Sequence, residues 1–230
     1  VEYSNMRRGR LTPEDFQKMA AAKHELAALP TYIDDTPGQT VFDITRQVRR
    51  FHRENPLGLV IVDHIGWVRP TDRKMMKVHQ VEQVTQELKN LARKLHIPIL
   101  ALSQLSRGVE AREDKRPMLS DLRDSGSIEQ DADAVIFLYR YAYYLRQKEP
   151  EYTTSNDGAA EHAEWKGQVE HFDRIMDILI RKNRNGPSPM DLKVNCSMGT
   201  NHFFDDSIPA DETPLLDGDF GGQMEVNFDG

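Results

Sequence analysis

The chain has 230 residues, of which 38% are hydrophobic and 29% are charged, so it is long enough to bury a sizeable core under a polar surface. Its formal net charge of −7 argues against a simple basic nucleic-acid-binding protein, but a local basic lining remains compatible with that sum. The single cysteine, Cys196, excludes an internal disulfide and favours a reducing, cytoplasmic compartment, and no apolar run is long enough to cross a membrane.

Residues 1–56 predict two capped helices with a short strand between them. Thr12 supplies a capping hydroxyl, and Pro13 and two acids follow it, so we expect a helix from there to about Leu29. A short strand is predicted at residues 31–33. Thr40 should cap a second helix that ends before Asn55-Pro56.

Residues 57–63 form a continuous apolar run that ends in Asp63. Such a run predicts a central parallel strand that is buried on both faces, and ligands bind α/β proteins at the carboxyl ends of these strands. In phosphate-binding ATPases an aspartate at this place, the Walker B position, holds Mg²⁺ directly or through water. The alternative is an aspartate that caps the following loop, and the residues alone do not decide between the two.

An amphipathic helix and a second apolar strand come next. From Val78 the apolar positions recur every three or four residues as far as Leu95, which is typical of a helix with one buried face. Residues 99–102 predict a buried strand that leads to Gln104. A strand–helix–strand unit places Asp63 and Gln104 at the same edge of a parallel sheet.

Residues 116–133 form a polar segment that feeds an apolar strand at residues 134–139. Gly126 permits a positive φ or the close approach of a ligand to the backbone. One interpretation is an acidic loop that stays in water. The other is a loop that meets a phosphate backbone, with Arg123 as the cation. The residue types alone favour the first.

The remaining chain predicts an aromatic segment, a helix and a hairpin. Residues 140–144 could stack on bases, although packing at a domain surface or a subunit interface is the interpretation that we favour. A helix at residues 159–172 carries His162, Glu164 and His171, whose spacing matches no known metal-ligand pattern. Residues 175–180 and 190–196 predict a hairpin whose basic turn carries Lys182 and Arg184. His202-Phe203-Phe204 is expected to close the core.

The run Asp121-Leu122-Arg123-Asp124-Ser125-Gly126-Ser127-Ile128-Glu129-Gln130-Asp131-Ala132-Asp133 resembles a signature of the DnaB-type replicative DNA helicases. This resemblance implies an α/β fold of the RecA-like type, with a mostly parallel sheet flanked by helices and a C-terminal antiparallel hairpin. It also implies an ATP- and Mg²⁺-dependent hexameric ring that moves along single-stranded DNA and unwinds duplexes, with primase and a helicase loader as candidate partners.

The resemblance assigns roles to individual residues. Asp63 would position Mg²⁺, and Gln104 would couple nucleotide hydrolysis to DNA. The contacts with the DNA backbone would come from Arg123, Asp124 and Gly126. The basic hairpin would reach the nucleotide of the neighbouring subunit through Lys182 and through Arg184, the latter as an arginine finger.

The chain departs from the family pattern in two places. No Gly-Lys pair occurs in it, so the phosphate-binding loop G-x-x-x-x-G-K-[ST] is absent. We therefore expect the C-terminal part of a split or truncated helicase: a domain at residues 1–205, poor in ATP hydrolysis by itself, with an acidic disordered tail at residues 206–230. Residues 147–173 exceed the usual family connection and are interpreted as an insertion. The alternatives are a non-catalytic RecA-like module that binds DNA or joins a partner ATPase, and a strand-exchange or clock-type ATPase.

Overall fold

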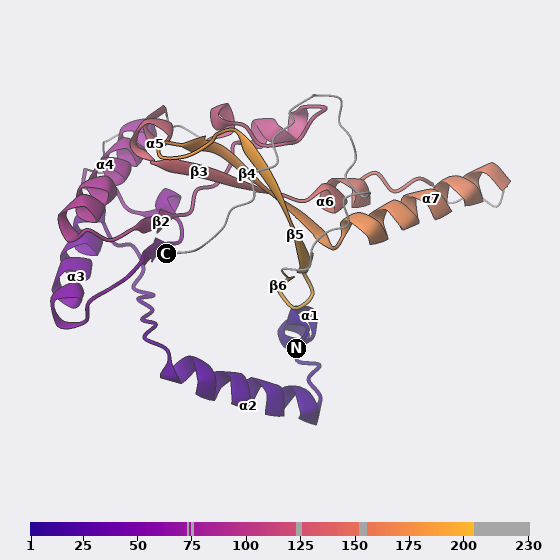
Figure 1. Cartoon of the computed structure of the whole chain (residues 1–230), viewed down its shortest axis with the longest axis horizontal. Coiled ribbons are helices and arrows are strands. Elements are labelled where there is room, and N and C mark those ends of the chain that lie inside the picture. Colours follow the sequence, from indigo (N-terminus) through magenta and orange to yellow (C-terminus); the bar gives the residue numbers. More distant parts are fainter. Residues whose placement is uncertain (73, 75, 123–125, 152–155, 205–230) are drawn as a thin grey trace.

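Two β-sheets carry the fold. The computed structural model describes residues 1–72, 74, 76–122, 126–151 and 156–204 (Figure 1). In the first sheet, β1 (Val60–Val62) and β2 (Ile99–Ala101) pair in parallel, with Val62 opposite Ala101. The second sheet is antiparallel in the order β3 (Ala134–Tyr139), β4 (Ile175–Asn183), β5 (Met190–Ser197) and β6 (His202–Phe204). The predicted α/β class is confirmed, and the antiparallel part extends beyond the expected hairpin because β3 and β6 pair with its two strands.

Helices precede and connect these strands. Their bounds are α1 (Tyr3–Arg8), α2 (Pro13–Ala28), α3 (Val41–Glu54), α4 (Lys77–Leu95), α5 (Gly126–Asp131), α6 (Tyr141–Arg146) and α7 (Asn156–Phe172). Short 3₁₀ helices lie at Ile65–Trp67, Arg107–Ala111 and Leu119–Asp121. None of the described helices is long and apolar enough to cross a membrane.

Capping boxes start α2 and α3 where the sequence predicted their first turns. The Thr40 hydroxyl accepts a hydrogen bond from Asp43 N at 3.2 Å, and Thr40 N donates to the Asp43 carboxylate at 3.1 Å. Thr12 and Asp15 make the same reciprocal pair at the start of α2. Each pair satisfies backbone N–H groups that the helix itself leaves without an acceptor.

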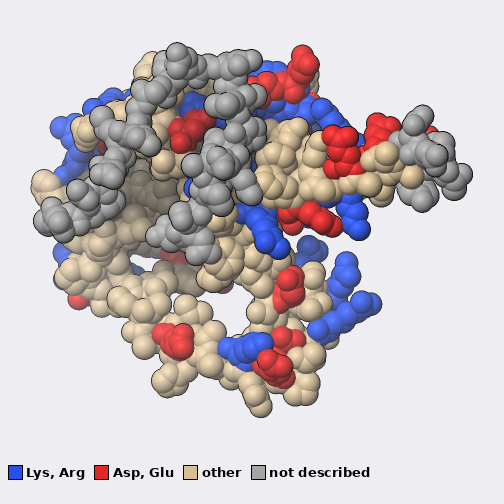
Figure 2. Space-filling view, turned by 45° about the vertical axis from the view of Figure 1, so that its right-hand side comes forward, with Lys and Arg blue, Asp and Glu red and all other residues tan. Residues whose placement is uncertain are grey.

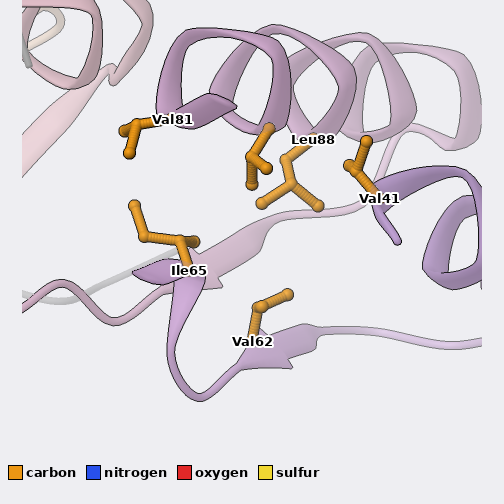
Figure 3. Close-up of a cluster of buried hydrophobic side chains, with 6 residues drawn as sticks. Val41, Val62, Ile65, Val81 and Leu88 are labelled. Atoms are coloured by element: carbon orange, nitrogen blue, oxygen red, sulfur yellow. The ribbon is translucent and has the colours of Figure 1, made fainter. Parts of the chain in front are cut away.

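The first core lies between α3, α4 and the parallel strands. Figure 3 shows side chains from these elements pointing toward one another, among them Val62 of β1 and Leu88 of α4. The full buried set is Val41, Val62, Ile65, Val81, Val84 and Leu88. The spacing of apolar residues three and four apart therefore predicted the buried face of α4 correctly.

The second core lies on one face of the antiparallel sheet. Along β3 the side chains alternate, so that Val135, Phe137 and Tyr139 are buried and the residues between them are exposed. Leu122 and Leu179 complete this cluster. Ile128 of α5 packs against both cores and so connects the two sheets.

Several apolar side chains remain exposed on the opposite faces of the strands. Ile61 of β1 is 58% exposed, Leu100 of β2 50%, and Leu138 of β3 61%. No residue of α2 is buried, and open gaps separate the lower arm that contains this helix from the rest of the molecule (Figure 2). The prediction that the parallel strands are buried on both faces is therefore wrong for this chain.

Two further expectations are wrong. Residues 31–33 form no strand, because no described strand pairs with them, and Ile33 is 89% exposed. His202–Phe204 does form β6, but all three side chains are exposed and do not close the core. The predicted tail at residues 206–230 lies outside the described residues.

Candidate functional site at the edge of the parallel sheet

Asp63 and Gln104 lie at the same edge of the parallel sheet, as predicted. The pairing of β1 with β2 continues past the strand ends, since Leu102 N donates to Val62 O at 3.0 Å and Ile65 N donates to Leu102 O at 3.0 Å. Asp63 follows Val62 directly, and Gln104 comes two residues after Leu102. Both side chains are exposed, so a ligand at this edge can reach them.

A backbone bridge connects this edge to the glycine-containing segment. Leu105 and Leu122 pair in an antiparallel bridge, and Ser106 N donates to Asp121 O at 2.8 Å. Leu122 is buried, so the turn before it directs this side chain inward. The chain therefore returns to the end of β2 directly before the segment for which DNA contacts were predicted.

The predicted DNA-contacting residues fall partly outside the described chain. Arg123 and Asp124 lie outside the described residues. Gly126 is the first residue of α5; its φ is not in the left-handed region, and a Cβ there would meet no atom within 4 Å. A positive φ at Gly126 is therefore not observed, and the approach of a ligand to its backbone stays a prediction.

The two aspartates at the end of the polar segment, Asp131 and Asp133, have partners. Asp131 accepts a hydrogen bond from the Thr85 hydroxyl of α4. Asp133 is bound by Lys89 and, at 3.3 Å, by Arg184. The Lys89 hydrogen bond, followed by the charges of Lys89 and Arg184, holds the pKa of Asp133 below its usual range. These carboxylates therefore offset their desolvation by pairing with α4 and the hairpin.

Lys182 and Arg184 contact the C-terminal end of α5. The Lys182 ammonium donates to Glu129 O and, at 3.4 Å, to Gln130 O. Arg184 Nη2 donates to Gln130 O at 2.8 Å. Positive side chains are favourable there, because the carbonyl groups at a helix C-terminus carry partial negative charge.

The prediction that Lys182 lies in the hairpin turn is wrong. β4 continues to Asn183, since Val135 and Ala134 of β3 pair with Lys182 and Asn183. Arg184 is the first residue beyond the strand, and its side chain is 50% exposed. Within the described part of the chain, no hydrogen bond or ion pair joins either cation to Asp63 or Gln104. The structure thus contains two separate groups of predicted site residues.

Sequence reasoning missed a network of ion pairs whose carboxylates, Asp121 and Asp177, are buried. Arg112 binds Asp121, and Arg116 binds Asp177 at 2.7 Å. Residues 108–115 have a mixed charge pattern that is typical of a mobile surface loop, but they form part of this ordered network. Arg112 and Asp121 are nine residues apart in a segment without regular periodicity, so no sequence signal identified the pair.

The remaining polar features offer no metal centre. Among the residues that the structure describes, no three His, Cys, Asp or Glu side chains are grouped so that they could hold a metal ion. On α7, His162 lies 3.4 Å from Glu149, and Trp165 donates to Leu145 O, so this helix packs on α6. Surface hollows of about 210 and 500 Å³ lie on α3 and between α1 and α2, and no predicted site residue lines them.

Comparison with known proteins gives one consistent result. The family model of the DnaB-like helicase C terminal domain matches residues 1–204. The replicative DNA helicase DnaB of Rickettsia typhi is 43% identical over 187 residues, which cover 81% of this chain and 37% of that protein. The corresponding helicase of Geobacillus stearothermophilus is 42% identical over 188 residues, with the same coverage. The chain therefore spans 37% of the length of these relatives.

Solved structures resemble most of this fold. One of them, an ATPase domain, has a TM-score of 0.73 and 33% sequence identity, and the match covers 90% of this chain and 66% of that one. A DnaB-like replicative helicase, solved in a study of its interactions with primase, has a TM-score of 0.71 and 33% identity, with 88% and 44% covered.

Proposed function

Because the chain belongs to the DnaB-like helicase C-terminal domain family, we propose that it forms part of the motor of a replicative DNA helicase. The motor couples ATP hydrolysis to translocation along single-stranded DNA and to duplex unwinding, within a hexameric ring. The observation that carries this proposal is the emergence of Asp63 and Gln104 side by side from neighbouring parallel strands. Primase and a helicase loader are the proposed partners.

The nucleotide lies at the edge where Asp63 and Gln104 are exposed. Mg²⁺ prefers oxygen ligands and is commonly held by one or two carboxylates together with substrate phosphates, so the single carboxylate of Asp63 fits this ion. The bound ion would neutralise charge that develops on the phosphates. Gln104, one residue before the Leu105–Leu122 backbone bridge, senses the nucleotide and passes its state to the DNA-contacting segment.

DNA passes along Arg123, Asp124 and Gly126. Contacts of this kind reach the phosphate backbone and not the bases, so binding is largely indifferent to sequence and weakens with salt. Figure 2 shows acidic and basic side chains interspersed over the face that it draws, which fits a local DNA path better than a uniformly basic surface.

Lys182 and Arg184 act on the nucleotide of the neighbouring subunit. Half of the Arg184 side chain is exposed, and only part of its guanidinium is used by Gln130 and Asp133. An arginine that stabilises charge on a transferring phosphoryl group contributes roughly 10³–10⁵ in rate. The contacts of both cations with α5 support a route by which a change at the neighbouring nucleotide reaches Gly126.

Hydrolysis requires a phosphate-binding loop, which is absent from the 230 residues of this chain. We propose that a second segment supplies this loop and covers the exposed apolar strand positions, among them Ile61, Leu100 and Leu138. The same exposed positions favour the second candidate function, a non-catalytic RecA-like module that joins a partner ATPase.

One experiment separates the two functions. The chain is mixed with a separately produced segment that carries a phosphate-binding loop of the form G-x-x-x-x-G-K-[ST], and DNA-stimulated ATP hydrolysis is measured. A motor regains hydrolysis with the wild-type chain and loses it with Arg184→Ala. Restored hydrolysis that is indifferent to Arg184→Ala would eliminate the finger role, and hydrolysis indifferent to Asp63→Ala as well would favour the non-catalytic module.

A further inference from the structure

Residues 105–122 leave the end of β2 and return to it, and we refer to them as the return segment. Its two ends are joined by the Leu105–Leu122 bridge and by the hydrogen bond from Ser106 N to Asp121 O. Gln104 directly precedes this segment, and the residues that lead to Gly126 directly follow it. Any change in its closure therefore alters the geometry between the two.

A buried ion pair closes the return segment from inside. Arg112 Nη1 lies 3.1 Å from Asp121 Oδ1, and Arg112 Nη2 lies 2.8 Å from Oδ2, so the contact is bidentate. Met118 N also donates to Oδ2 at 2.8 Å. Asp121 is 6% exposed, and the Arg112 side chain is 28% exposed. Bidentate, charge-assisted pairs of this kind fix orientation as well as distance.

The guanidinium of Arg112 donates all of its described hydrogen bonds to acceptors within the return segment. Its Nε donates to Asp114 O at 3.2 Å, and Nη2 also donates to Arg116 O at 2.8 Å. All three nitrogens of Arg112 are thus used within the return segment. A direct contact with a DNA phosphate would require the side chain to abandon these acceptors.

We propose that Arg112 and Asp121 are positioning residues that clamp the return segment shut and thereby hold Gln104 in register with the DNA-contacting residues. This inference rests on the proposed helicase function. Removing one partner leaves the charge of the other without its ion-pair partner. An unpaired Asp121 carboxylate regains hydration by moving toward water. This movement breaks the hydrogen bond from Ser106 N to Asp121 O and the adjacent Leu105–Leu122 bridge.

The first test measures the clamp without DNA. Amide hydrogen exchange is followed in the full chain and in Arg112→Gln and Asp121→Asn, with Asp173→Asn as the matched control. Asp173 is bound by Arg140 and Arg146 at 2.8 and 2.9 Å, and none of these three residues belongs to the return segment. We expect the Ser106 amide to exchange about tenfold faster in the two clamp variants, from the loss of one charge-assisted contact, and to be unchanged in the control. Unchanged exchange in the clamp variants would overturn the proposal.

The second test measures the binding of a fluorescent oligothymidylate by anisotropy at several salt concentrations. Clamp variants should bind about tenfold more weakly with an unaltered salt slope, because no phosphate contact is removed. A slope that falls by about 0.7 in Arg112→Gln would mean that Arg112 touches a phosphate, and would replace the positioning role by a direct one. Unaltered affinity beside faster Ser106 exchange would also overturn the inference.

A double variant separates positioning from simple stabilisation. Arg112→Gln with Asp121→Asn buries no unpaired charge, so it should recover thermal stability relative to either single change. Positioning predicts that DNA affinity stays low in this variant, whereas a purely structural role predicts that affinity returns together with stability. If the wild-type chain fails to bind DNA, the proposed function and the role of the clamp in DNA binding are both wrong. The rate of amide exchange at Ser106 still decides whether the clamp itself exists.

Discussion

Arg116 connects the return segment to the antiparallel sheet, and its loss should be costly. It donates to Asp177 at 2.7 Å and to Asp191 at 3.1 Å, and its guanidinium lies 5.2 Å from the centroid of the Tyr139 ring. Asp177 is only 7% exposed, so Arg116→Ala leaves a buried carboxylate without its closest cation. Breaking such a pair costs roughly 3–5 kcal/mol. Because the Arg116 side chain is itself 26% exposed, we expect the low end, about 3 kcal/mol.

The pH dependence of this loss has a definite sign. Burial raises the pKa of Asp177, and Arg116 opposes that shift, so the substitution raises the pKa further. A carboxyl whose pKa is higher in the folded than in the unfolded state favours folding at low pH, and this contribution is lost as pH rises through the folded pKa. The destabilisation by Arg116→Ala should therefore shrink when the pH falls from about 7 toward about 4.5, closer to the range in which aspartate is protonated.

Urea and thermal unfolding, followed by circular dichroism at both pH values, measure the effect. For a protein of this size, about 3 kcal/mol corresponds to a fall in Tm of roughly 6–12 °C. The control is Arg46→Ala, whose partner Asp43 forms a more exposed pair and whose loss should cost at most about 0.5 kcal/mol. A loss below about 1 kcal/mol for Arg116→Ala, or a loss that is equal at the two pH values, would refute the reasoning.

Three other predictions concern the first core, the cap of α3 and the cysteine. Leu88→Ala removes a buried side chain from the first core and should lower the free energy of unfolding by about 2–5 kcal/mol in urea titrations, whereas an effect under about 1 kcal/mol would mean that the site is open to water. Thr40→Ala should cost about 1 kcal/mol through loss of the α3 cap, and Thr40→Ser should retain most of this stability. Burial raises the pKa of the Cys196 thiol, so a thiol-specific reagent at about pH 8 should modify it slowly in the native chain and quickly in urea; equal rates would contradict its burial.

Elements with a strong periodic or capping signal could be predicted from the sequence. Val81, Val84, Leu88 and Leu91 are spaced for one helical face, and all four are buried in α4. The apolar runs that end before Asp63 and Gln104 correctly predicted that both residues lie at the same edge of the parallel sheet, because a strand–helix–strand unit leaves little choice of topology. These predictions depended on local chemistry and chain direction.

Predictions that depended on a distant partner were wrong or absent. Residues 31–33 have strand-forming side chains, yet a strand requires a neighbour with which to form hydrogen bonds, and none of the described strands pairs with them. Lys182 belongs to β4 because β3 pairs with it across the chain. The pair of Arg112 with Asp121 exists only after the return segment closes, so neither composition nor spacing could indicate it.

The position of Ile128 has a consequence for how the molecule melts. Its side chain packs against the hydrophobic residues of both cores, at the seam between the parallel and the antiparallel sheet. Contacts that cross such a seam make the two halves lose structure together, as a single cooperative transition. Shortening the Ile128 side chain would weaken the coupling between the unfolding of the two halves. Calorimetry would then resolve two overlapping heat-absorption peaks in place of one.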